Sequence, residues 1–286
     1  MTNLHGDINR MQHTMNFRVV LFGAAAVLVA CSDANTTQPA QSVAGAVAPV
    51  SSTQQSSLVQ ANGVQVVRGT GDITAAVNQY RALLGTLNPN LAGEQPGGRR
   101  EINWDGVPAA RTNVDNFPGN FFNVNSPRGV LFTTPGTGFR ISDNGYTDVN
   151  PNYAGEFNFF SPTKLFVSVG STIMDVQFVV AGSNTPARVT GFGSVFADVA
   201  VERSTTIEYF DETGRSLLLV AAPKRTDAAG LSFVGATFPT RSVSRVRITV
   251  GDTPIGANSN DLVIKEGKHD IVATDDFIYG EPRARK

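Results

Sequence analysis

Hydrophobic and polar residues alternate in short runs through most of the chain after residue 99. Thr205–Phe210 alternates as far as the turn Asp211-Glu212-Thr213-Gly214, and Arg215–Val220 continues the pattern beyond it. A period of two residues is typical of a strand that buries one face, and the intervening turn predicts a hairpin. The same reasoning predicts strands over residues 101–105, 129–133, 138–142, 165–169, 173–180, 187–198, 205–210, 215–221, 231–238, 243–250 and 270–279.

One segment, residues 72–84, has a helical period instead. Asp72 is a favourable N-cap residue, and Gly85 is a favourable stop. We expect this helix to pack its apolar face against the strands. That face consists of Ile73, Ala76, Val77, Tyr80, Leu83 and Leu84.

Many short strands with little helix predict an all-β fold, a jelly-roll β-sandwich with one short N-terminal α-helix. Strands and helices do not alternate along the chain, which disfavours a parallel α/β fold. Phenylalanines lie throughout Phe117–Phe277, and the segment between residues 31 and 116 has none. The hydrophobic core is therefore expected in the C-terminal part.

Composition removes several classes of function. The chain has 286 residues, a net charge of −1 and only 16% charged residues, so it lacks the basic surface of a nucleic-acid-binding protein. Its single Cys excludes an intrachain disulfide and a thiolate zinc site.

The N-terminal residues have the features of an export signal. Val19–Ala30 is uncharged and follows Arg18. This run is shorter than the roughly 20 apolar residues that span a bilayer, and it suits the apolar core of a signal peptide. Met15 opens a well-formed signal, so residues 1–14 are interpreted as an upstream start.

The signal ends in Leu28-Val29-Ala30-Cys31, which resembles the bacterial lipobox. That resemblance implies cleavage after residue 30 and lipidation of Cys31. A plain signal peptide with an incidental Cys is the alternative. Ser32, where an Asp would retain a lipoprotein at the inner membrane, favours the outer membrane or the cell surface.

The remaining chain divides by composition. Residues 31–66, which are almost uncharged, are predicted to be a flexible tether, with an ordered edge segment and a short strand at Val64–Val67 as the alternative. Residues 67–98 are assigned to the helix and its connection. Residues 99–286 are assigned to the sandwich.

No catalytic residues are predicted. After export, His269 is the only histidine left to serve as a base, and it is interpreted as a solvated loop residue. Asp211 and Glu212 belong to a hairpin turn. Paired carboxylates of a glycosidase remain open, because residues brought together by folding leave no sequence signature.

Asp275 and Asp276 lie inside the last hydrophobic strand, where unpaired carboxylates are costly to bury. Alternation places the two side chains on opposite faces. Either ligation of Ca²⁺ by oxygen atoms or pairing with arginine would remove the cost, and pairing or a solvated strand end is the favoured interpretation.

Trp104 is the only tryptophan. In a sugar-binding module it would be a stacking platform for the apolar face of a sugar. Packing in the core is the favoured alternative.

Four segments carry a family resemblance: Gly191–Asp198, Ile207–Asp211, Val246–Ile248 and Asp275–Phe277. With Arg99–Pro108, they resemble jelly-roll domains of exported bacterial surface proteins of the PEP-CTERM and choice-of-anchor kind, which are distantly similar to galactose-binding-like modules. The resemblance implies no specific activity. It does imply a structural Ca²⁺, with the candidate ligands Asp275, Asp276, Asp198 and Glu101.

Together these features predict an exported, lipid-anchored envelope protein. Its partners would be a membrane, through the lipid on Cys31, and a glycan or surface polymer bound by a non-catalytic module; nucleic acid is not expected. A structural or adhesive envelope protein is the first alternative. A glycan-active jelly-roll enzyme is the second.

Overall fold

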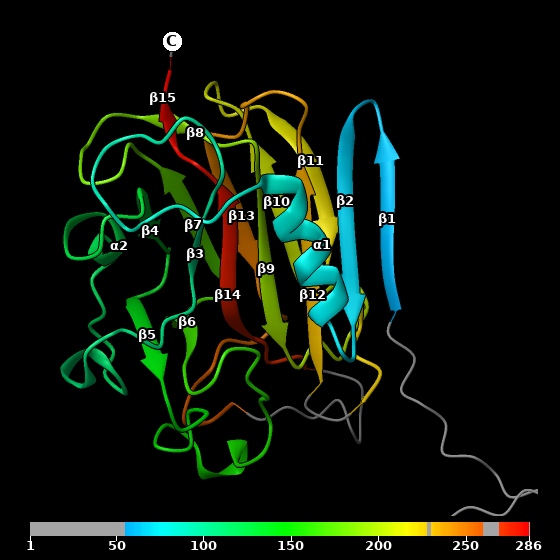
Figure 1. Cartoon of the computed structure of the whole chain (residues 1–286). Coiled ribbons are helices and arrows are strands. Elements are labelled where there is room, and N and C mark those ends of the chain that lie inside the picture. The colour runs from blue at the N-terminus through cyan, green and yellow to red at the C-terminus, as the bar shows by residue number, and fades with distance from the viewer. Residues whose placement is uncertain (1–54, 228–229, 260–268, 286) are drawn as a thin grey trace, which may run out of the picture. The chain divides into compact units, whose positions relative to one another are not determined.

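The computed structural model describes residues 55–227, 230–259 and 269–285 (Figure 1). All of them belong to one unit, Pro49–Lys286. The expected signal peptide, Cys31 and residues 31–54 of the expected tether lie outside the described residues. No helix among the described residues is long and apolar enough to cross a membrane.

The larger of two main sheets has eight strands. They are β1 (Gln55–Ala61), β2 (Val64–Thr70), β3 (Arg99–Ile102), β5 (Gly138–Ser142), β6 (Leu165–Val169), β9 (Gly191–Ala197), β12 (Leu231–Thr237) and β14 (Ala273–Gly280). Their order is β1-β2-β12-β9-β14-β6-β5, with β3 also paired to β14. Each pairing in this sheet is antiparallel.

The second sheet has five strands, and a small third sheet has two. The five are β4 (Val130–Thr133), β7 (Ile173–Phe178), β10 (Thr206–Phe210), β11 (Ser216–Ala221) and β13 (Arg245–Thr249), in the order β11-β10-β13-β7-β4. The small sheet pairs β8 (Ala187–Arg188) with β15 (Arg283–Ala284). The helical elements are α1 (Thr74–Leu84), the short α2 (Phe121–Val124), and the 3₁₀ turns Ala109–Arg111 and Pro151–Tyr153.

These sheets confirm the predicted all-β sandwich with one short N-terminal helix. Residues of both main sheets form one core, with Phe192 and Phe277 from the first and Met174 and Val246 from the second. Most predicted strands are present with bounds close to the expected ones, but 187–198 is divided into β8 and β9, and the strand expected at 101–105 is β3, which ends at Ile102. Strands of the second sheet, such as β13, bury alternate residues against the core, whereas β9 and β14 at the centre of the first sheet are buried on both faces.

Helix α1 covers the outer face of the first sheet (Figure 1). Asp72 Oδ1 accepts a hydrogen bond from the Thr74 backbone amide (3.0 Å), and Gly85 ends the helix with a φ of 93°. The predicted apolar face is buried except at Leu83, which is 38% exposed. The helical period therefore predicted the buried face correctly at every position except Leu83.

The predicted tether boundary at residue 66 is wrong. β1 and β2 pair over their whole length and join the first sheet through β12, so the sandwich begins at residue 55 and not at residue 99. Asn62 and Gly63, with φ of 51° and 77°, form the turn between them. Asn-Gly is a strong hairpin signal, because both positions of such a turn need positive φ. Uncharged Ser, Gln and Val residues suit an exposed strand as well as a linker.

Glycines allow α1 to approach the sheet closely. A Cβ atom at Gly235 would lie 2.8 Å from the Tyr80 ring and 3.0 Å from the Gly193 Cα. The Tyr80 hydroxyl donates to the Ala236 carbonyl oxygen (3.0 Å), so the ring cannot move aside without losing this bond.

We predict that Gly235→Ala lowers the free energy of unfolding by about 1–3 kcal/mol, because the added methyl group overpacks the helix–sheet contact. Gly97→Ala is the matched control, since its Cβ would meet no atom within 4 Å, and it should change stability by less than about 0.5 kcal/mol. Urea denaturation measures both. Equal midpoints for the two variants would contradict the close approach.

Candidate functional site

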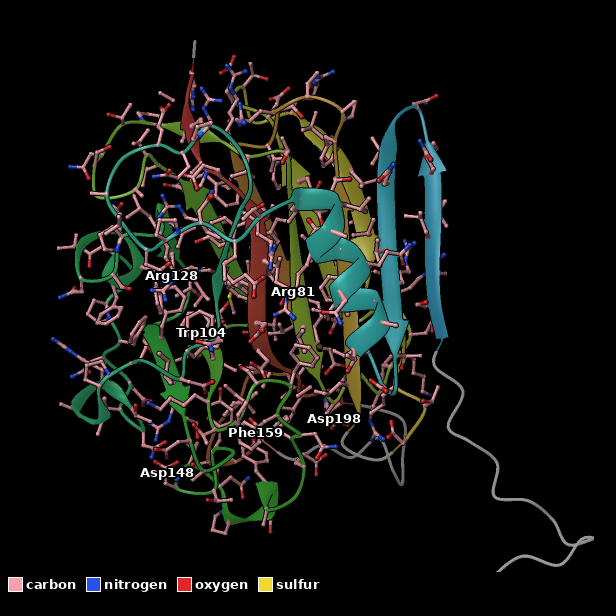
Figure 2. All side chains as sticks on the ribbon, in the orientation of Figure 1. Arg81, Trp104, Arg128, Asp148, Phe159 and Asp198 are labelled. Atoms are coloured by element: carbon pink, nitrogen blue, oxygen red, sulfur yellow. The ribbon has the colours of Figure 1, made fainter. Side chains whose placement is uncertain are left out.

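Three of the four predicted acidic ligands lie together where α1, β3 and β14 meet. Figure 2 shows Arg81 of α1 next to β14. The register of β14 against β9 shifts between Thr274 and Phe277, which places a bulge at Asp275 and Asp276. A bulge redirects side chains that regular alternation would send to opposite faces. Sequence alternation could not predict this.

Both aspartates contact the loop that precedes β6. Ser161 Oγ lies 3.0 Å from Asp275 Oδ1 and 2.8 Å from Asp276 Oδ1. The Phe160 backbone amide donates to Asp275 Oδ2 (2.7 Å). The two carboxyl groups therefore share one hydroxyl and hold the loop against β14.

Burial changes the pKa of both carboxyl groups. Asp275 is fully buried, and this burial together with the neighbouring charge of Asp276 raises its pKa to about 8. Burial also raises the pKa of Asp276 above the ordinary value. Two adjacent buried carboxyl groups cannot both ionise at low cost, so the raised pKa favours the protonated form of Asp275 at neutral pH.

Glu101, Asp276 and Asp198 form ion pairs with arginines. Arg81 donates from Nε and Nη2 to the two oxygens of Glu101 (3.0 and 2.8 Å), and its Nη2 lies 3.4 Å from Asp276 Oδ2. Arg99 Nε contacts Glu101 at 2.6 Å. Asp198, which directly follows β9, pairs instead with Arg225. Pairing with arginine is the alternative to calcium that the sequence left open.

The four predicted ligands do not fit a single calcium ion in this arrangement. The Arg81 guanidinium occupies the space between Glu101 and Asp276, and Asp198 belongs to a separate pair. Within the described residues, no group of three or more His, Cys, Asp or Glu side chains is placed to hold a metal ion. Calcium binding stays a prediction of the sequence.

Trp104 packs in the core, which confirms the favoured interpretation of the sequence, and it is not exposed as a stacking platform for a sugar. Its side chain is 1% exposed and stacks on Phe166 with a centroid separation of 4.0 Å. Its Nε1 donates to the Asp275 carbonyl oxygen (2.8 Å). Trp104 is enclosed because β3 ends at the centre of the aromatic core, so it packs there and anchors the bulge.

Two other residues considered for chemistry have structural contacts. His269 is half exposed, and its Nδ1 lies 3.0 Å from Thr253 Oγ1. Asp211 accepts hydrogen bonds from Thr213 and Arg215, which hold its pKa well below the usual range and close the predicted hairpin turn. Cys31 lies outside the described residues.

A surface hollow of about 360 Å³ lies over Trp104. We call it the Phe121 hollow, after the half-buried ring in its wall. The Arg128 guanidinium stacks 4.9 Å from the Phe122 ring at one side. Sequence reasoning named only Trp104 among the residues of this hollow as a candidate for binding, because the others come from irregular connections without a period. The residues around it are Asn103, Trp104, Gly106, Val107, Pro108, Phe121, Phe122, Asn125, Ser126 and Arg128.

No protein-family model matches the chain, and no curated protein is significantly similar to it. Among solved structures, the chain is similar to the enzymatically active domain of tailspike protein 4 (TSP4dN, orf213) of bacteriophage CBA120. The identity is 14% and the TM-score is 0.17. The match covers 50% of this chain and 21% of the tailspike chain, which is too weak a similarity to support a function.

We predict that the free energy of unfolding falls as pH rises between about 4 and 8, by up to about 1.4 kcal/mol per pH unit from this site. The folded protein keeps a proton on Asp275 in this window, whereas an unfolded Asp, with a pKa near 3.9, has lost it. The stability that Asp275 contributes is fully present below the pKa of the unfolded Asp, near 3.9, and is lost as pH rises through the pKa of about 8 in the folded protein.

Asp275→Asn should flatten this pH dependence, because an amide cannot ionise. Glu202→Gln, which neutralises an exposed carboxylate, should leave it unchanged. Urea denaturation across the same pH range provides the comparison. A wild-type slope retained in Asp275→Asn would show that another group is responsible.

Proposed function

We propose that the chain is an exported lipoprotein, anchored through Cys31, whose sandwich is a non-catalytic module that binds a glycan or another surface polymer. The observation that carries this proposal is the Phe121 hollow. Its volume of about 360 Å³ lies near the lower end of the range for small-ligand pockets, about 300–1,000 Å³.

The chemistry of the hollow suits a sugar. Phe121 and Val107 supply an apolar wall, which matches the C–H face of a pyranose ring. Amide groups of Asn103 and Asn125 both donate and accept hydrogen bonds, as sugar hydroxyls require, and Arg128 adds further donors. An apolar wall with a few polar groups is typical of an orienting binding site.

A binding role is favoured over catalysis by the same residues. Glycoside hydrolysis ordinarily uses two carboxyl groups on either side of the scissile bond. The residues that line the Phe121 hollow include no Asp or Glu. The adjacent carboxyl groups of Asp275 and Asp276 are buried and hydrogen-bonded to Ser161.

A structural or adhesive role is the second candidate, and β1 favours it. This seven-residue strand pairs on one side with β2 and lies at the end of the sheet order. It has no charged residue, and Leu58 and Val59 are 43% and 53% exposed. Soluble proteins usually protect such edges with charges or proline, so an unprotected edge suits assembly.

We predict that Cys31→Ser moves the protein from the membrane fraction to the soluble fraction of its host. Two or more acyl chains give stable anchoring, and serine cannot form the thioether that carries them. Fractionation followed by immunoblotting measures the change. An unchanged membrane fraction for Cys31→Ser would contradict the anchor.

We predict that Phe121→Ala weakens glycan binding at least about tenfold, equivalent to about 1.4 kcal/mol, because the apolar wall is lost. Val124→Ala is the matched control, since Val124 is on the same helix, is 64% exposed and lies outside the hollow. A glycan array identifies the ligand, and calorimetry gives the affinities.

Phe121 also packs against Phe117, with ring centroids 5.1 Å apart, so Phe121→Leu serves as a second variant that keeps apolar volume. It should fold normally and bind with intermediate affinity. Absence of wild-type binding to any envelope glycan, or equal losses for Phe121→Ala and Val124→Ala, would contradict the proposal.

A further inference from the structure

Three arginines converge where β8 and β15 pair, at the top of Figure 1. Arg188 and Arg283 are directly opposite each other in this antiparallel pair. Arg241, from the connection between β12 and β13, completes a hollow of about 270 Å³. We call this site the arginine pocket; its lining residues are Arg188, Arg241, Arg283 and Ala284.

The arrangement is electrostatically unfavourable as it stands. Like charges directly opposite on paired strands repel each other. Arg188 lies 3.8 Å from Glu212, and Arg283 lies 3.6 Å from Glu94. Both distances exceed those of a charge-assisted hydrogen bond, so these glutamates offset part of the charge without occupying the guanidinium donors nearest to them. Arg283 Nη1 donates instead to the Pro96 carbonyl oxygen (2.9 Å).

Of the three arginines in the pocket, Arg241 has the positive charge that is least offset by a neighbouring carboxylate. Its Nε atom is buried without a hydrogen-bond partner, and within the described residues its guanidinium has no ion pair. Burial, followed by the positive charge of Arg283, lowers the pKa of Arg241.

The nearby acidic residues do not cancel the excess. Glu281 has both oxygens engaged by Arg100, at 2.7 and 2.8 Å. Glu212 is shared between Arg188 and Arg285, the latter at 3.5 Å. A buried donor without a partner and an excess of positive charge both indicate a missing anion.

We propose that the arginine pocket binds a tetrahedral oxyanion, a phosphate or sulfate group, either as a free ion or as an ester on a surface polymer. Three guanidinium groups from three chain segments can each donate to a different oxygen. A carboxylate would be satisfied by one bidentate arginine and would leave the other two uncompensated. The volume accommodates one such group and the first atoms of its carrier.

This site is separate from the Phe121 hollow, and the two share no lining residue. The inference therefore goes beyond glycan binding at that hollow. Failure of one proposal leaves the other intact.

The test uses purified full-length protein, with inorganic phosphate and inorganic sulfate as probes against chloride at equal ionic strength. Calorimetry should show saturable binding of phosphate or sulfate but not of chloride. Arg241→Gln should weaken this binding about tenfold or more, because one charge-assisted contact is lost. Arg111→Gln, at an exposed arginine in the 109–111 turn, should leave it unchanged.

Thermal unfolding separates a ligand-binding role from a structural one. Without anion, Arg241→Gln should melt at the same temperature as the wild type or higher, because removal of one arginine relieves the repulsion. At the same concentration, phosphate should raise the melting temperature of Arg241→Gln less than that of the wild type. Arg188→Gln, on a different segment, should behave in the same way.

A phosphate monoester such as glucose 6-phosphate distinguishes the two sources. Tighter binding of the ester than of free phosphate supports a group on a polymer, and the reverse supports a free ion. The proposal is overturned if neither phosphate nor sulfate binds saturably. It is also overturned if Arg111→Gln loses as much affinity as Arg241→Gln.

Discussion

The buried ion pair between Arg100 and Glu281 joins β3 and the end of β14 to the irregular connection before β3. Both side chains are 0% exposed, and their contacts are bidentate. Arg100 also donates to backbone carbonyls of the 89–93 connection and of Pro127, while Glu281 accepts from Asn88 and Gln95. A buried charge is tolerable only when it is paired and its hydrogen bonds are satisfied, so the irregular connection must fold around this pair.

Both proposed sites depend on that junction. Arg100 lies in β3, which leads directly to Trp104 beneath the Phe121 hollow. Glu281 follows β14 and precedes Arg283, which enters the arginine pocket. The ion pair therefore joins the two chain segments that lead to the Phe121 hollow and to the arginine pocket, although neither site includes either of its residues.

The acidic residues of the sandwich illustrate how a fold with few charges distributes them. Asp275 avoids the cost of a buried charge by remaining protonated beside Asp276. Glu101 and Asp198 instead meet arginines, Arg81 and Arg225. These contacts also fix neighbouring elements: Arg81 ties α1 to Glu101 and Asp276, and Ser161 ties the loop before β6 to Asp275.

The amino-acid sequence by itself determined the fold class, because local periodicity decides which face of a strand or helix is apolar, and that face must be buried. The predicted strands, the helix beginning near Asp72 and the turn at Asp211 all follow from such neighbours in the chain. The dipeptide Asn62-Gly63 also predicts the hairpin between β1 and β2, but the surrounding uncharged residues are equally typical of a linker.

Only the tertiary structure decided the sites. The bulge that brings Asp275 and Asp276 to one side depends on the register of β14 against β9, and the burial of Trp104 depends on the aromatic rings of distant strands. Arg188, Arg241 and Arg283 come from three segments and meet only when β8 and β15 pair. Local alternation tells which face of a strand is buried, but the partner of a strand and the position of a bulge depend on residues far apart in the sequence, so they are decided only when the strands pair.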